Sequence, residues 1–142
     1  MSRKLRTVIL RLAGALLLAL GVLHLGVTPI IARMLKRGMS AESAQWLSPP
    51  LLLNHVVVGI LLLPLGALTL FAAAPAGSGT PWALVVVRVT ALAVATLPLA
   101  LGLLMGAHYF EAVAFVVATV IVCAASVALL AAACWPVENA GT

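Results

Sequence analysis

Residues 51–74 read LLLNHVVVGILLLPLGALTLFAAA, a run that contains no charged side chain. A helix that crosses the hydrocarbon core of a bilayer needs about 20 mostly apolar residues. Three further stretches meet that requirement, at residues 7–28, 82–105 and 110–135. The sequence therefore predicts four transmembrane helices joined by short connectors, in one domain that spans residues 1–142.

The composition of the whole chain supports this prediction and excludes other classes of protein. Only 8% of the 142 residues are charged, whereas a water-soluble domain carries about a quarter. That deficit excludes a soluble globule, a disordered chain and a nucleic-acid-binding module. Two cysteines, both within residues 110–135, provide no disulfide framework. The predicted fold class is all-α, an up-down antiparallel four-helix bundle that has the lipid bilayer as its main partner.

The connectors carry the usual helix-breaking residues. Pro29 follows the first predicted span, and Pro49 and Pro50 precede the second. Between them, Ser40 is a suitable N-cap for a short helix with an acidic first turn. We therefore expect the first span to end near Pro29 and a separate interfacial helix to occupy residues 40–47.

The basic residues indicate an orientation, because cytoplasmic loops of membrane proteins carry an excess of lysine and arginine. Four basic residues lie at or near the start of the first span and three in the connector that follows it: Arg3, Lys4, Arg6 and Arg11, then Arg33, Lys36 and Arg37. The bias is small, and it favours cytoplasmic N- and C-termini. The Ala-, Leu- and Val-rich composition is typical of a bacterial inner-membrane protein.

Small and polar residues gather on one face of each predicted helix. In residues 51–74 that face holds His55, Gly59, Gly66 and Thr69. Membrane helices pack through such small residues, because lipid supplies no hydrophobic drive for helix association. The pattern predicts close backbone contact and does not by itself indicate an activity.

All three histidines of the chain are predicted to lie at one end of the bundle. His24 falls just before the end of the first span and His55 just after the start of the second. Because these two helices run in opposite directions, the two imidazoles should lie at the same depth. His108 lies in the turn between the third and fourth spans, at the same end, and Glu111 follows it by three residues. Under the favoured orientation this is the outer end.

This group of residues predicts a metal or haem site. Imidazole is the commonest protein ligand of transition metals, and two histidines on neighbouring helices can hold a b-type haem from both sides. His24, His55, His108 and Glu111 are the candidate ligands, with Asn54 and Tyr109 as their neighbours. The alternative is that the histidines only form hydrogen bonds or lie solvated among the headgroups. A bound cofactor would serve electron transfer or metal handling.

Two other functions remain open from the sequence. Arg11 and Arg88 lie on alternate helices in the predicted cytoplasmic half, and Arg88 is a candidate ligand-binding residue for a lipid headgroup, a quinone or a carboxylate. The protein would then be a small-molecule carrier, although both arginines could simply extend to the interface. The other possibility is a non-catalytic accessory subunit of a membrane complex. No catalytic motif is recognisable, so the sequence leaves open whether the protein is an enzyme.

Overall fold

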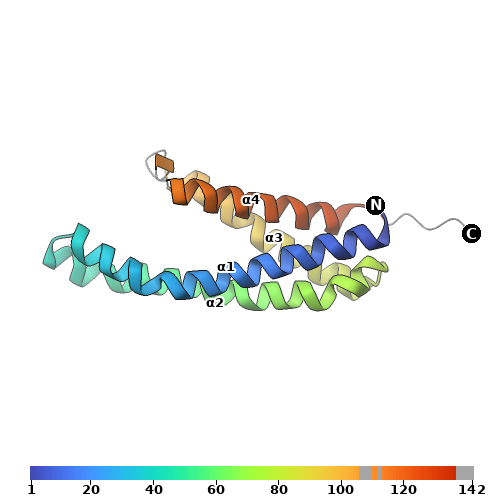
Figure 1. Cartoon of the computed structure of the whole chain (residues 1–142), viewed down its shortest axis with the longest axis horizontal. Coiled ribbons are helices and arrows are strands. Elements are labelled where there is room, and N and C mark those ends of the chain that lie inside the picture. The colour runs from blue at the N-terminus through green and yellow to red at the C-terminus, as the bar shows by residue number, and fades with distance from the viewer. Residues whose placement is uncertain (106–109, 112, 137–142) are drawn as a thin grey trace, which may run out of the picture.

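The structure is a computed structural model that describes residues 1–105, 110–111 and 113–136, except the side chain of Ala114. All regular structure in these residues is helical and forms four helices: α1 (Arg3–Gly38), α2 (Ala41–Gly77), α3 (Pro81–Leu104) and α4 (Val113–Cys134) (Figure 1). Each helix contains a stretch long and apolar enough to cross a membrane. The predicted all-α four-helix bundle is confirmed, and by length and composition the chain is a multi-pass membrane protein.

The bundle has two ends with different compositions. The terminal end holds Met1, the turn between α2 and α3, and Pro136 after α4 (Figure 1). At the opposite end, the connector end, α1 joins α2 and α3 joins α4 (Figure 1). Of the described residues, His24 and His55 lie toward the connector end, whereas Arg3, Arg6 and Arg88 lie near the terminal end.

The first two helices are longer than the spans that the sequence predicts. α1 continues through Pro29 to Gly38, and residues 41–47, expected as a separate interfacial helix, are the first turns of α2. The predicted cap itself is present, since Ser40 accepts a hydrogen bond from the Ser43 backbone N–H at 3.2 Å. Membrane helices tolerate proline because neighbouring groups satisfy the freed carbonyl, which explains why Pro29 does not end α1.

Their length carries α1 and α2 beyond a bilayer core. The 36 residues of α1 extend about 54 Å at 1.5 Å per residue. The hydrocarbon core is only about 30 Å thick. The α1–α2 pair accordingly extends past the α3–α4 pair at the connector end (Figure 1).

Four glycines bring the backbones of α1 and α2 into contact. A Cβ atom added at Gly66 would lie 2.8 Å from the Gly14 carbonyl oxygen, and one added at Gly21 would lie 3.0 Å from the Gly59 carbonyl oxygen. No side chain separates the two helices at these positions. The predicted small-residue face of residues 51–74 is thus the face on which α2 packs against α1.

The apolar core is concentrated in the terminal half of the bundle. Its largest fully buried apolar side chains are Leu10, Leu17, Val87, Val94 and Leu129. Toward the connector end the α3–α4 pair diverges from α1–α2 (Figure 1), and side chains there are highly exposed, such as Leu103 at 74% and Val113 at 76%. The four helices therefore form one packed unit only near the terminal end.

Replacing Gly66 by alanine tests the contact between α1 and α2. The added methyl group would meet two backbone atoms of α1 at 2.8 Å, so α1 and α2 must move apart. We expect a loss of about 1–3 kcal/mol in the free energy of unfolding, as for other overpacked sites, measured by denaturation in mixed micelles.

The matched control is Gly26→Ala on α1, where an added Cβ atom meets nothing within 4 Å. Alanine favours the helical state over glycine, so this variant should be as stable as the parent or slightly more so. Equal stability losses in both variants would contradict the proposed backbone contact.

Candidate functional site

The structure places His24 and His55 directly against one another. Their ring centroids lie 4.6 Å apart and the ring planes meet at 27°, which is a stacked arrangement. One ring comes from α1 and the other from α2. Gly59 lies one turn after His55, and a Cβ atom there would be 3.1 Å from the His24 Cβ. Because Gly59 has no side chain, the His24 ring has the space to reach the His55 ring.

The hydrogen bonds of the two rings leave ring nitrogens available. His24 Nδ1 lies 3.2 Å from the Leu20 carbonyl oxygen, which can only accept a hydrogen bond. A neutral His24 ring in this bond carries its proton on Nδ1 and has an unprotonated Nε2. His55 Nε2 is buried and has no hydrogen-bond partner among the described residues. A pair of half-buried imidazoles with unused nitrogens can bind a metal ion or a proton.

The other predicted ligands are not brought to this pair in the part of the chain that the structure describes. His108 and Tyr109 lie outside the described residues. Glu111 is exposed in the connection between α3 and α4, and Asn54 is exposed beside His55. Among the described residues, no group of three or more His, Cys, Asp or Glu side chains is arranged to hold a metal ion.

A second polar cluster lies at the terminal end, around the last turn of α4. Arg6 is only 2% exposed; its Nη2 donates to the Trp135 carbonyl, and its Nη1 donates to the Ala76 carbonyl at 3.4 Å. Arg88 Nε donates to the Ala133 carbonyl at 3.3 Å. Arg6 and Arg88 therefore reach carbonyl oxygens two residues apart, the Ala133 carbonyl in the last turn of α4 and the Trp135 carbonyl just after it.

The sequence prediction missed Arg6 and considered Arg11 together with Arg88. Arg11 is exposed. The burial of Arg6 could nevertheless have been predicted from the sequence. Arg6 continues, toward the N-terminus, the regular spacing of the buried positions of α1. Those positions are Arg6, Leu10, Ala13, Leu17 and Leu20, and alternating steps of four and three residues keep them on one helical face. A charged residue that falls on the buried face of a helix can therefore itself be buried, with specific hydrogen-bond partners.

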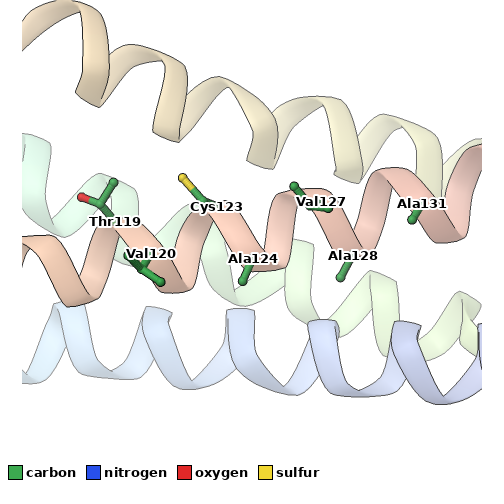
Figure 2. Close-up of a pocket in the computed structure, with 7 residues that line it drawn as sticks. All are labelled: Thr119, Val120, Cys123, Ala124, Val127, Ala128 and Ala131. Carbon is green, nitrogen blue, oxygen red and sulfur yellow. The ribbon is translucent and has the colours of Figure 1, made fainter.

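A shallow groove runs along α4 and offers little chemistry. Seven residues of α4 line it: Thr119, Val120, Cys123, Ala124, Val127, Ala128 and Ala131 (Figure 2). The Thr119 hydroxyl donates within the helix to the Phe115 carbonyl at 2.8 Å, and Cys123 is a free cysteine. The groove therefore has the character of a lipid- or helix-facing surface.

Comparison of the chain with protein-family models, with curated proteins and with solved structures finds no match. The assignment of a function rests on the stacked histidines, on the arginine cluster and on the way in which the helices place them.

Proposed function

We propose that this multi-pass membrane protein binds a transition-metal ion, with His24 and His55 as its protein ligands, and serves metal handling or electron transfer at the membrane surface. The observation that carries the proposal is the stack of the two imidazoles at 4.6 Å between neighbouring helices. Ionisable side chains within membrane helices are rare and costly, and those that occur usually have a function.

The chemistry of the pair fits a metal ion. Neutral imidazole binds zinc, copper, iron and nickel through an unprotonated nitrogen. The hydrogen bond from His24 Nδ1 to the Leu20 carbonyl is the kind that fixes the orientation of a metal-binding histidine and leaves Nε2 for the metal. Two protein ligands leave coordination positions open, for which His108 and Glu111 are the proposed additional ligands.

The depth of the pair gives a metal ion access from water. His24 follows Arg6 by 18 residues, or about 27 Å along α1, and Arg6 lies level with Ala76 near the end of α2. That separation is close to the thickness of the hydrocarbon core. The imidazoles therefore lie near the membrane boundary at the connector end.

A b-type haem requires a different arrangement of the same rings. Two axial histidines point their nitrogens at the iron from opposite faces of the porphyrin. His24 and His55 instead stack face to face at 4.6 Å, which leaves no space for a porphyrin between them. Haem binding would need α1 and α2 to separate here, whereas a bare ion needs only the two rings to turn until an unprotonated nitrogen of each points at it. A bare metal ion is therefore the favoured ligand.

Metal binding to the purified full-length protein tests this function. We expect the protein to retain or take up one of zinc, copper, iron or nickel, and His24→Ala and His55→Ala each to weaken the affinity at least about tenfold, since even indirect partners of a metal are worth that much. Elemental analysis and competition with a chromogenic chelator supply the measurement. An absorption spectrum before and after reduction distinguishes a haem from a bare ion.

The matched control for the histidine variants is Gln45→Ala, an exposed polar position near the same end of α2. It should bind metal like the parent protein. A parent that takes up none of these metals, or histidine variants that bind as well as Gln45→Ala, would contradict the proposed function.

A second candidate function is that of an accessory subunit in a membrane complex. The observation that favours it is the exposure of apolar residues on α4, where Val113, Val116 and Val120 are all exposed. Steps of three and four residues keep these positions on one helical face, so α4 presents an apolar face to which another helix can bind. A metal-free protein that purifies with a second polypeptide would favour this function over metal binding.

We further propose that the protein lies in the inner membrane of a bacterial cell with both termini in the cytoplasm. The cationic terminal end supports this orientation through the excess of positive charge on cytoplasmic segments. In a variant without Cys123 and Cys134, a cysteine introduced at Ser40 should react with an impermeant thiol reagent added to intact cells, and one at Ser2 should not. Labelling of the cysteine at Ser2 but not of the one at Ser40 would contradict this orientation and indicate the opposite one.

A further inference from the structure

The terminal end gathers positive charge around the last turn of α4. Arg6 and Arg88 both donate to carbonyl groups there, and the amino-terminal ammonium of Met1 donates to the Pro136 carbonyl at 3.1 Å. Arg6 is almost fully buried, and in the part of the chain that the structure describes its Nε is a buried donor without a hydrogen-bond partner. Carbonyl groups satisfy some of the N–H donors of this cluster, but they carry no net charge.

The helix dipoles do not neutralise this cluster. The C-termini of α2 and α4 each contribute about half a negative charge, which would attract the arginines. At the same end α1 and α3 begin, and each helix start contributes about half a positive charge. Summed over the four helix ends these partial charges come to about zero, so they leave the net positive charge of the terminal end unchanged.

The acidic residues do not neutralise it either. Glu42 and Glu111 lie at the connector end. Glu138 and the terminal carboxylate belong to the last residues, outside the described part, and provide two negative charges even if both are counted here. The terminal end holds five positive groups: the Met1 ammonium, Arg3, Lys4, Arg6 and Arg88. An excess of positive charge therefore remains.

Arg88 gives this excess charge an accessible contact point. Its side chain is exposed, and within the described residues it donates only through Nε, to the Ala133 carbonyl, so its terminal Nη groups are available to an anion. A guanidinium with free Nη groups is well suited to a phosphate, which it can bind through two parallel hydrogen bonds. Arg6, which donates to a carbonyl two residues further along the chain, adds a second, buried charge that an anion at Arg88 would help to offset.

From this geometry we propose that the terminal end binds a phosphate-bearing anion, with Arg88 in direct contact and the buried Arg6 contributing its charge. A phospholipid headgroup and a free phosphate share this chemistry. The site lies at the opposite end of the bundle from His24 and His55, and it is independent of the proposed metal binding.

Thermal unfolding of the delipidated full-length protein in a neutral detergent tests the proposal. At constant ionic strength, short-chain phosphatidylglycerol, phosphatidylcholine and inorganic phosphate are added separately. We expect saturable stabilisation by phosphatidylglycerol and a half-saturating concentration about tenfold higher for Arg88→Gln, which corresponds to about 1.4 kcal/mol. Stabilisation by inorganic phosphate as well would identify the bound anion as a soluble phosphate. A response to the lipid alone would identify it as a phospholipid headgroup.

The control is Lys36→Gln, which removes an exposed positive charge near the end of α1 at the connector end and should respond like the parent. Native mass spectrometry of the parent, which needs no variant to fold, should show phosphatidylglycerol retained in preference to phosphatidylcholine. The proposal is overturned if the two lipids stabilise and remain bound equally, if Arg88→Gln responds like the parent, or if Lys36→Gln loses as much affinity as Arg88→Gln.

Discussion

The contact between the backbones of α1 and α2 is the constraint on which the rest of this structure depends. In lipid, helices gain nothing by hiding apolar side chains from one another, so close approach through small residues provides the attraction. Gly14 meets Gly66, and Gly21 meets Gly59. These two contacts fix the register of the helices. The same register places His24 against His55 toward one end and the Arg6 guanidinium beside the Ala76 carbonyl at the other.

The two ends of the bundle offer different chemistry because the helices are held together differently at each. At the terminal end all four helices meet, and buried donors such as Arg6 find carbonyl groups at the ends of α2 and α4. Toward the connector end only the pairs α1–α2 and α3–α4 persist (Figure 1), so polar groups there are less enclosed. The first environment supplies the carbonyl partners that a buried cation such as Arg6 needs, and a site open to exchange with water is better placed in the second.

Much of the fold could be predicted from the sequence, because four apolar runs of membrane-spanning length permit few alternatives. The equal depth of His24 and His55 could also be predicted from the sequence, since that prediction requires only the order of the helices and their directions. Three features did not follow. Pro29 does not end α1, because a membrane helix can absorb a proline. The burial of Arg6 depends on the exact spacing of a core stripe, and the divergence of α3–α4 depends on helix tilt, which hydropathy does not record.

The stacking of His24 on His55 is most directly tested by solid-state NMR of the full-length protein, labelled only at histidine and reconstituted in lipid. A His108→Gln variant leaves these two rings as the only labelled groups. We expect a through-space cross-peak between the two imidazoles, because their centroids lie 4.6 Å apart. Two isolated ring systems without such a cross-peak would show that α1 and α2 do not pack in this register, and would contradict the site built on it.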